Sequence, residues 1–309
     1  MKNKKVLVVL GGTSGERKIS LASGIACVKA LKKKGYKVST FDPKKKLYNS
    51  INPKKVDFIF NALHGRDGED GVAQSYFEYL KIPYTHSGVI SSYNAMNKII
   101  SKEIFKTNKI KSPKYFVIEK NNFNQIILKK YIKMKKIKFP IVVKPINEGS
   151  SIGVKISKNI IDLYKSTKKL FKRYEELIFE PYIGGQEIQV AVINGTPIGA
   201  IELKPKRQFY DYKAKYLKSA KTEHIMPAKL KKLKYKEALE IAKKAHKVLG
   251  CNGVTRSDFK FFNNQFYLLE INTQPGMTNL SLVPEIAHYR GISFENLVEK
   301  ILLNTSINK

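Results

Sequence analysis

Apolar runs alternate with an amphipathic segment over the first 94 residues. The apolar run at 4–10 predicts a buried strand, and a Gly/Ser turn separates it from a predicted helix at 20–34. The apolar positions of that helix recur at helical spacing: Leu21, Ile25, Val28 and Leu31. Residues 37–41 and 56–63 are predicted as further strands. Two of these strands end in Gly-rich loops, and the order of elements predicts a doubly wound α/β unit that binds ligands at the carboxyl ends of its strands.

The pattern changes near residue 95, where a second unit begins with a predicted helix at 95–107. The later elements of this unit are predicted as a strand at 115–118, a Lys-rich helical stretch, strands at 139–144 and 153–157, a helix at 159–174 and a strand at 177–180. This mixture predicts a small α+β unit.

A third unit, rich in hairpins, is expected after Gly184-Gly185. Strands at 186–193 and 197–204 flank Asn194-Gly195, a dipeptide typical of a tight hairpin turn. The remaining elements are expected as a polar loop at 206–224, a helix at 229–249 and a second hairpin with strands at 254–262 and 265–272.

The second hairpin carries candidate metal ligands. Because side chains alternate along a strand, Asp258 shares a face with Arg256 and Lys260, while Glu270 shares a face with Asn272. The apolar residues between them are expected to turn both carboxylates and the amide outward into one site. Oxygen ligands suit a hard cation such as Mg²⁺ or Mn²⁺, and nucleotide sites commonly hold Mg²⁺ with few carboxylates and substrate phosphates. The alternative is a solvated face on which Arg256 pairs with Asp258.

Lys144 ends an otherwise apolar strand and could reach a phosphate as a point charge. The loop that follows, at 148–153, has small residues whose backbone N–H groups could approach phosphates. It is not a Walker A motif, because the GxxxxGK[ST] spacing is absent. An ordinary hairpin turn is the alternative.

Residues 11–16 join a strand to a helix, as in dinucleotide-binding proteins, but the GxGxxG spacing fails at Thr13 and Glu16. A carboxylate at Glu16 suits a cationic ligand such as an amino group. Equally, an exposed Glu at a helix start complements the helix dipole, so both interpretations stay open.

Two further features allow alternative interpretations. His64 could be a general base or a ligand, but taken alone it is interpreted as a hydrogen-bonded structural residue. The tyrosines of the polar loop, Tyr210, Tyr212 and Tyr216, could stack on bases or anchor a mobile lid.

Composition limits the class of protein. The 309 residues are 42% hydrophobic, which allows a sizeable core in two or three units. Cys27 and Cys251 lie far apart and are interpreted as reduced packing residues of a cytosolic protein. The apolar run near the N-terminus is too short for a signal peptide, and no stretch is long enough to span a membrane.

The formal net charge of +33 raises the alternative of a nucleic-acid partner. Only six of the 58 basic residues are Arg, and the lysines are spread over the whole chain. Because nucleic-acid readers usually favour Arg, solvated Lys-rich faces are the preferred interpretation, with no nucleic-acid partner.

Several segments together resemble the D-alanine–D-alanine ligases of the ATP-grasp superfamily. They are LGGTSGER (10–17), ALHGRDGEDG (62–71), PYTHSGV (83–89), VVKPINEGSSIGV (142–154), FYDYKAKY (209–216) and LLEINTQPGMTNLSLVPEIA (268–287), in family order over nearly the whole chain. The resemblance implies an ATP-grasp fold with an N-terminal doubly wound, Rossmann-like substrate domain at 1–94. It also implies a small ATP-grasp subdomain at 95–183 and a C-terminal subdomain at 184–309 with a mobile loop at 206–221.

The implied activity is ATP-dependent joining of two D-alanines through a D-alanyl phosphate, in cytoplasmic peptidoglycan precursor synthesis by a homodimer. Two Mg²⁺ (or Mn²⁺) ions would be held by Asp258, Glu270 and Asn272. The implied ATP-binding residues are Lys98, Lys144, Glu180, the backbone of Tyr182 and Ile183, Glu187 and Lys215. A second hypothesis is a related ligase with another amino acid or a hydroxy acid as acceptor.

The resemblance also implies substrate-binding and catalytic residues. Glu16 would hold the first ammonium, with His64 beside the substrate, and Ser281 and the Leu282 N–H would bind the second carboxylate. The implied catalytic groups are Arg256 and the Gly276 N–H at an oxyanion site, and a chain of Glu16, Ser150 and Tyr216.

Tyr216 bears on the acceptor, because several relatives that use D-lactate carry His at this position. A protonated His could repel an ammonium, so Tyr216 implies an amine acceptor. Lys213 stands where the family often has a carboxylate, and this departure concerns how the loop closes.

Overall fold

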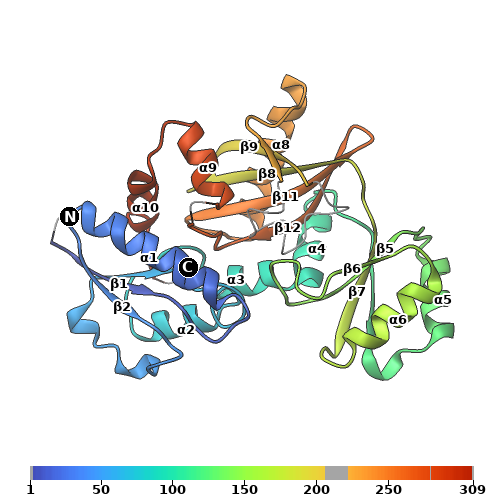
Figure 1. The fold of residues 1–309 in the computed structure, drawn as a ribbon, viewed down its shortest axis with the longest axis horizontal. Helices are drawn as coiled ribbons and strands as arrows, with labels where there is room; N and C mark the ends of the chain where they lie inside the picture. The colour runs from blue at the N-terminus through green and yellow to red at the C-terminus, as the bar shows by residue number, and fades with distance from the viewer. Residues whose placement is uncertain (1–2, 206–221, 279, 308–309) are drawn as a thin grey trace.

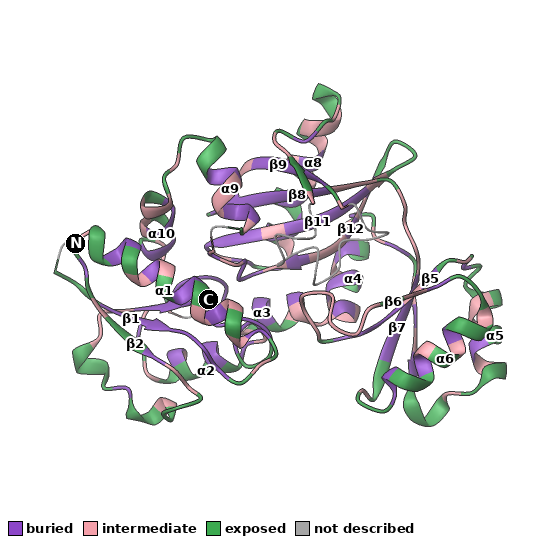
Figure 2. Ribbon diagram, viewed as in Figure 1, coloured by how far each residue is buried: buried purple, intermediate pink, exposed green. Residues whose placement is uncertain are grey.

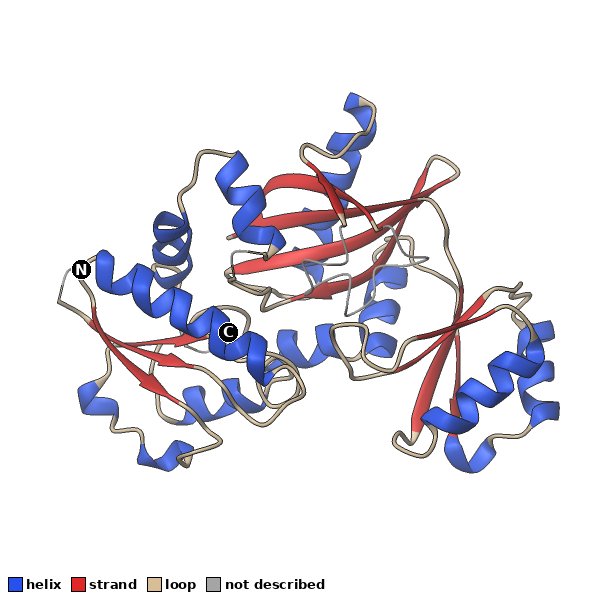
Figure 3. Ribbon diagram, viewed as in Figure 1, coloured by secondary structure: helices blue, strands red, loops and turns tan. Residues whose placement is uncertain are grey.

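The computed structural model describes residues 3–205, 222–278 and 280–307, whose strands form three separate sheets (Figure 1). Figure 3 shows the helices set around these sheets, and Figure 2 shows the buried residues concentrated along the strands. Among the described residues, no helix has both the length and the apolar character needed to cross a lipid bilayer.

The first sheet is parallel, in the order β2-β1-β3. Its elements are β1 (Lys5–Val9), α1 (Arg17–Lys33), β2 (Lys37–Phe41), the short helices η1 (Tyr48–Ser50) and η2 (Pro53–Lys55), β3 (Phe58–Asn61) and α2 (Val72–Tyr79). Val6 and Val8 pack on the α1 side, whereas Leu7 and Val9 pack with Phe77 of α2. Both faces of the sheet are therefore covered, which confirms the doubly wound arrangement.

The predicted apolar face of α1 is partly wrong. Leu31 is buried, but Ile25 is 51% exposed, and small residues face the sheet instead. Gly24 shows the reason, because a Cβ at this position would lie 2.5 Å from the Leu10 Cβ. The helix lies so close to the strand that large apolar side chains do not fit between them.

The second sheet is antiparallel, in the order β4-β7-β5-β6. Its elements are β4 (Phe116–Glu119), η3 (Lys120–Asn122), α5 (Gln125–Met134), β5 (Ile141–Pro145), β6 (Lys155–Ser157), α6 (Ile160–Leu170) and β7 (Glu176–Pro181). Ile141 and Val143 pack with Leu128 of α5 and Leu163 of α6. The opposite face of the sheet is therefore left for other contacts.

The third sheet is also antiparallel, in the order β10-β9-β8-β11-β12. Its elements are β8 (Gln186–Ile193), β9 (Thr196–Lys204), β10 (Glu223–Ile225), α8 (Lys232–Val248), β11 (Val254–Phe262) and β12 (Gln265–Asn272). Both predicted hairpins are confirmed. β10 begins at Glu223, where a loop was predicted, because it pairs with β9. Residues 206–221 of the predicted loop lie outside the described residues.

The single helix predicted at 95–107 is two helices, α3 (Val89–Met96) and α4 (Lys98–Thr107). Asn97 interrupts them in an extended conformation, and its side chain accepts hydrogen bonds from the N–H groups of Ile99 and Ile100 at 3.0 and 3.1 Å. This N-cap starts α4 in a new direction. The buried face of α4 includes Lys98 and Lys102.

The C-terminal helices α9 (Leu282–Tyr289) and α10 (Phe294–Leu302) bring the chain back to its first sheet. In Figure 1, α10 lies beside α1. Lys33 pairs with Glu295 at 2.8 Å, and Lys34 pairs with Glu299 at 2.8 Å. The N–H of Tyr84 donates to the Ser306 carbonyl at 3.2 Å. The last residues of the chain therefore complete the core formed by the first.

Truncation of the α10 core residue is expected to destabilise the protein. Leu297 is fully buried in the cluster shared with α1, whereas Leu303, just after the same helix, is 49% exposed. Leu297→Ala should cost about 2–5 kcal/mol, and Leu303→Ala should stay within about 0.5 kcal/mol of the wild type. Urea unfolding midpoints measure both. Equal midpoints for the two variants would contradict the packing described.

Candidate functional site

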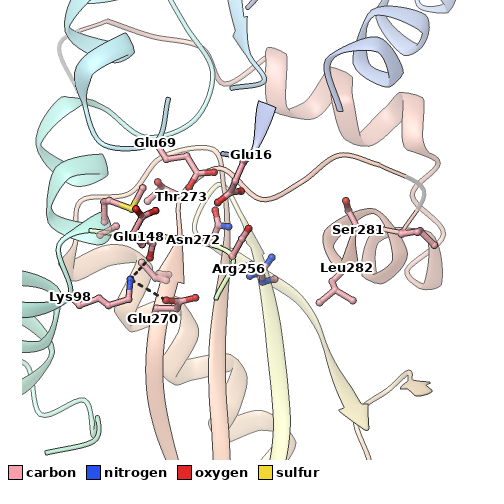
Figure 4. A pocket seen from close by; sticks show the side chains of 16 residues that line it. Glu16, Glu69, Lys98, Glu148, Arg256, Glu270, Asn272, Thr273, Ser281 and Leu282 are labelled. Atoms are coloured by element: carbon pink, nitrogen blue, oxygen red, sulfur yellow. Dashed lines mark hydrogen bonds and ion pairs between the residues drawn. The ribbon is translucent and has the colours of Figure 1, made fainter. Parts of the chain in front are cut away.

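Two adjoining pockets lie where the three sheets meet. The first, termed the acidic pocket, is shown in Figure 4 and is lined by Glu16, Glu69, Ala95, Met96, Lys98, Glu148, Gly149, Ser150, Arg256, Glu270, Ile271, Asn272, Thr273, Leu280, Ser281 and Leu282. The second, termed the inter-sheet pocket, lies between the second and third sheets. It includes Lys98, Val142, Lys144, Glu148, Ile156, Glu180, Tyr182, Ile183, Glu187, Asp258, Lys260, Leu269 and Glu270.

The acidic pocket combines opposite charges that suit an amino acid. Its carboxylates come from Glu16, Glu69, Glu148 and Glu270, and its cations from Lys98 and Arg256. Carboxylates stabilise an ammonium group, and a guanidinium stabilises a carboxylate or an oxyanion. A zwitterion can therefore satisfy both kinds of group in one place.

Glu16 is buried at 5% exposure, although it stands immediately before α1. The interpretation as an exposed helix-start residue is therefore wrong. The loop after β5 reaches it, since a Cβ on Gly149 would lie 2.9 Å from the Glu16 Oε1. Ser150 and Ser151 in this loop have left-handed φ angles of 50° and 60°, a conformation that non-glycine residues seldom adopt. The loop is thus held in an unusual shape directly against the Glu16 carboxylate.

The β11–β12 hairpin brings its polar residues together as predicted. Arg256 pairs across the ladder with Asn272, and Asp258 pairs with Glu270. Arg256 also donates to both oxygens of Asp258, at 2.7 and 2.9 Å. The alternative interpretation correctly predicted that Arg256 pairs with Asp258. It is wrong that this pair lies on a solvated face, because Asp258 is only 5% exposed.

These hairpin residues fit a hard metal ion by their donor chemistry. Within the described chain, no group of three or more His, Cys, Asp and Glu side chains could hold a metal. Asp258 and Glu270 instead face each other across the ladder, with Asn272 two residues further along β12, and form a sparse set of oxygen donors. Both Asp258 oxygens already accept from Arg256, and Asn272 Oδ1 accepts from the Gln274 N–H at 2.8 Å. Such a set leaves coordination positions for water and phosphate, as Mg²⁺ requires.

Glu180 lies in a buried cluster of lysines. Its carboxylate oxygens are each 2.8 Å from a lysine Nζ, one from Lys102 and the other from Lys144. Burial alone would raise the pKa of Glu180, but the two lysines hold its pKa below the usual range. Lys98 is also buried, and its Nζ donates to the Glu148 carbonyl at 2.6 Å and lies 3.6 Å from Glu270 (Figure 4). Burial lowers the pKa of Lys98.

The inter-sheet pocket has apolar walls with polar groups at its ends. Val142 and Ile156 line it from the second sheet, and Leu269 lines it from the third. Glu187 also lines it and pairs with Lys260 at 2.9 Å. The N–H of Tyr182 donates to the Pro140 carbonyl at 2.8 Å, which fixes the segment that follows β7. A slot of this kind accommodates a flat heteroaromatic ring between two sheets.

His64 is a buried, hydrogen-bonded residue, as interpreted from the sequence, and it lines neither of the two pockets. Its Nδ1 lies 3.1 Å from Glu69 Oε1, and its Nε2 lies 3.1 Å from Ser23 Oγ. Ser23 Oγ also accepts from the Met277 N–H at 3.1 Å. This chain connects Glu69 of the acidic pocket to the loop that contains Gly276.

Ser281 and Leu282, at the start of α9, line the acidic pocket. The Ser281 side chain does not cap α9, because its Oγ accepts from the Thr278 N–H at 2.9 Å. A Cβ on Gly276 would lie 2.8 Å from that Oγ, so the backbone passes close to it. The first N–H groups of a helix have no partner within the helix, and in α9 these are the N–H groups of Leu282 and Val283, because Pro284 has none and the Glu285 N–H donates to the Ser281 carbonyl at 3.3 Å.

Three residues discussed from the sequence, Lys213, Lys215 and Tyr216, lie outside the described residues.

Other residues of this site were not predicted from the sequence. Glu69, Glu148, Thr273 and Lys260 line the pockets without having been assigned to a site. Lys102 contacts Glu180 and was also missed. The available signal was the four-residue spacing of Lys98 and Lys102, which places both on one helix face.

Comparisons with known proteins give consistent results. A family model described as "D-ala D-ala ligase C-terminus" matches residues 104–303, and one described as "D-ala D-ala ligase N-terminus" matches residues 41–87. The D-alanine–D-alanine ligase of Pelagibacter ubique is 56% identical, covering 99% of each chain. The crystal structure of the Bacillus anthracis D-alanine–D-alanine ligase is 32% identical, with a TM-score of 0.86 and 97% of each chain covered. Its complex with ATP is 29% identical, with a TM-score of 0.84 and the same coverage.

Removal of the Glu180 charge should destabilise the protein. Glu180→Gln leaves Lys102 and Lys144 buried without their counter-ion, which should cost about 3–5 kcal/mol. The pKa of Glu180 is lowered in the folded state from its ordinary value of 4.5. The difference in free energy of unfolding between the wild type and Glu180→Gln should therefore be constant above pH 4.5 and should become smaller as the pH falls below that value. Urea unfolding of both proteins across this range tests it, with the exposed Glu119→Gln as control. A difference that does not change with pH would contradict it.

Proposed function

We propose that this chain, which belongs to the D-alanine–D-alanine ligase family, joins two D-alanines into D-alanyl-D-alanine with ATP, for peptidoglycan synthesis. Its fold is that of the ATP-grasp ligases. The observation that carries the proposal is the contact between the two pockets, which share Lys98, Glu148 and Glu270. An amino-acid carboxylate in one pocket can therefore meet a nucleotide phosphate that extends from the other.

ATP occupies the inter-sheet pocket. The adenine ring lies between the apolar walls, with Glu180 and the backbone of Tyr182 and Ile183 at its polar edge and Glu187 at the ribose. The phosphates extend toward Lys98 and Lys144, which line this pocket and whose charge they balance. The resemblance adds Lys215, which lies outside the described residues. The burial of Lys98 supports this assignment, because a buried ammonium gains most from an anionic ligand.

Two Mg²⁺ or Mn²⁺ ions, held by Asp258, Glu270 and Asn272, would neutralise charge on the transferred phosphoryl group. The chain itself supplies the orientation. The cross-strand pairing of Asp258 with Glu270 fixes both carboxylates at the boundary of the two pockets. Arg256 adds a guanidinium on the acidic side, where it can stabilise an oxyanion.

The two substrates bind in the acidic pocket in opposite orientations. Glu16 holds the ammonium of the first D-alanine. His64 contacts Glu69, which lines the same pocket, and so holds the Glu69 carboxylate in place. Ser281 and the Leu282 N–H hold the carboxylate of the second. This arrangement turns the second amine toward the first carboxylate.

The reaction consists of two transfers. A carboxylate oxygen of the first D-alanine attacks the γ-phosphorus of ATP, and ADP leaves. The deprotonated amine of the second D-alanine then attacks the acyl carbon to give a tetrahedral oxyanion. Arg256 and the Gly276 N–H face this oxyanion. Its collapse forms the amide and breaks the bond between the acyl carbon and the phosphate oxygen, and inorganic phosphate leaves with the proton that the amine loses. The resemblance also assigns Glu16 and Ser150 to a hydrogen-bonded chain with Tyr216, which lies outside the described residues.

We also propose that the units at 1–94, 95–183 and 184–309 are domains, and that the protein acts in the cytoplasm as a homodimer. The two cysteines are buried and free, as in a reducing compartment. Exposed apolar side chains on α2 and α3 support self-association, since Tyr79 is 83% exposed and Ile90 is 67% exposed.

The dimer is tested by placing a charge on this surface. Ile90→Asp should convert a dimer to a monomer in analytical ultracentrifugation, because an aspartate buried in an interface lacks a counter-ion. Ile161→Asp, at a 59% exposed position on α6, is the matched control and should leave the mass unchanged. A wild-type protein that sediments as a monomer contradicts the proposal.

The activity is tested by ADP release from the purified protein with ATP and Mg²⁺. D-Alanine should give ADP and a dipeptide identified by mass, whereas L-alanine should give neither. D-Alanine with D-lactate should still give only the dipeptide, since Tyr216 implies an amine acceptor. ADP release only with another acid or amine would leave the fold assignment intact and overturn the proposed substrates.

Loss of one metal-facing carboxylate should remove turnover without unfolding the protein. Glu270→Gln should lower the rate on the order of 10³-fold, because charge stabilisation at the phosphoryl group is worth several kcal/mol. Glu176→Gln, at an exposed position, is the control and should be fully active. Full activity of Glu270→Gln would refute the assigned role of Glu270.

A further inference from the structure

Lys102 is a buried lysine that contacts neither ATP, nor a metal ion, nor D-alanine in the proposed reaction. Its side chain is only 1% exposed, in the middle of α4. Its Nζ lies 2.8 Å from Glu180 Oε1 and donates to the Pro113 carbonyl at 3.2 Å. Lysines are rarely buried to this extent unless they are paired. Lys102 does not line the inter-sheet pocket, so it faces Glu180 from behind.

The two lysines that contact Glu180 differ in what else they can reach. Lys144 lines the inter-sheet pocket and can turn toward a nucleotide phosphate, whereas Lys102 is enclosed and cannot. When Lys144 leaves Glu180 for a phosphate, Lys102 is the contact that stays. Without it, a fully buried carboxylate would lose the cations that offset its desolvation.

We propose that Lys102 is a positioning residue for ATP binding: it is the resident counter-ion that keeps Glu180 ionised and in place, so that Lys144 is released to the phosphates. This inference rests on the proposed function, in which Glu180 meets the adenine edge. An ionised carboxylate accepts a hydrogen bond from the 6-amino group of adenine and repels the 6-oxo group of guanine. Lys102 thus supports both phosphate binding and the choice of base.

The charged and titratable groups around Glu180 come from several elements. Lys98 and Lys102 come from α4, Lys144 from β5 and Tyr115 from the segment before β4. Across the pocket stand Glu187, Asp258 and Lys260 of the third sheet. Lys102 and Lys144 are the direct ion-pair partners of Glu180 within the described residues. Removal of Lys102 should therefore raise the pKa of Glu180 and favour its protonation as the pH falls.

The test compares three substitutions in the full-length protein. Lys102→Met removes the charge, Lys102→Arg retains it, and Lys106→Met removes a 75% exposed charge one turn further along the same helix. ATP and GTP dissociation constants are measured without D-alanine from pH 6 to 9. ATP KM and kcat are measured with saturating D-alanine over the same range.

Lys102→Met should weaken ATP binding and raise the KM for ATP by about tenfold or more, with a larger effect at pH 6 than at pH 9. Its preference for ATP over GTP should fall, while kcat should change much less. Lys102→Arg should recover most of the affinity, and Lys106→Met should match the wild type. If Lys102→Met does not fold, Lys102→Gln, which can still donate to Pro113, takes its place with the same expectations.

A purely structural role for Lys102 predicts a different result. Lys102→Met would then be less stable to urea, but its ATP affinity, pH profile and base preference would equal those of the wild type, and this outcome overturns the inference. Failure of the proposed function is distinguishable, since a wild type that binds ATP but releases no ADP with D-alanine contradicts the ligase activity alone. The binding comparison still decides the role of Lys102.

Discussion

The carboxylate of Glu180 cannot remain charged in the interior without cations beside it, and the site is built around this requirement. Its partners, Lys102 and Lys144, come from α4 and from the neighbouring strand β5. One turn away on α4, Lys98 reaches Glu148 after β5 and Glu270 on β12. The helix thus connects the second sheet to the third through buried charges. Buried ion pairs seldom stabilise a fold more than apolar packing does, so their presence here points to ligand binding.

Strand alternation explains how the same sheets supply both a core and a site. On β5, Ile141 and Val143 pack against helices, while Val142 and Lys144 line the inter-sheet pocket. The β11–β12 ladder likewise places Asp258 opposite Glu270 at the boundary of the two pockets. Nucleotide and amino acid therefore meet at side chains set by backbone pairing, whose geometry is more rigid than that of a surface loop.

The parts of this structure that follow from local pattern could be predicted from the sequence. The bounds of the β11–β12 hairpin and the shared face of Asp258 and Glu270 need only period-two alternation and a turn. The break at Asn97 was missed, because an N-cap inside an otherwise helical pattern is a weak signal. The spacing of Lys98 and Lys102 places both on one helix face, but the pairing of Lys102 with Glu180 and the close packing of α1 could not be predicted, since both depend on contacts between segments distant in the sequence. The roles of individual site residues rested on resemblance.

The charge of the chain is a poor guide to its ligands, and the distribution of the acids shows why. The sequence has 25 acidic residues, and among the described ones seven line the two pockets: Glu16, Glu69, Glu148, Glu180, Glu187, Asp258 and Glu270. Most lysines lie on solvated faces, where substitution has little effect on stability. The pocket acids are instead required by particular partners, such as an ammonium, a metal ion or a buried lysine. A strongly basic protein therefore keeps a locally acidic site, and its net charge reflects its surface rather than its chemistry.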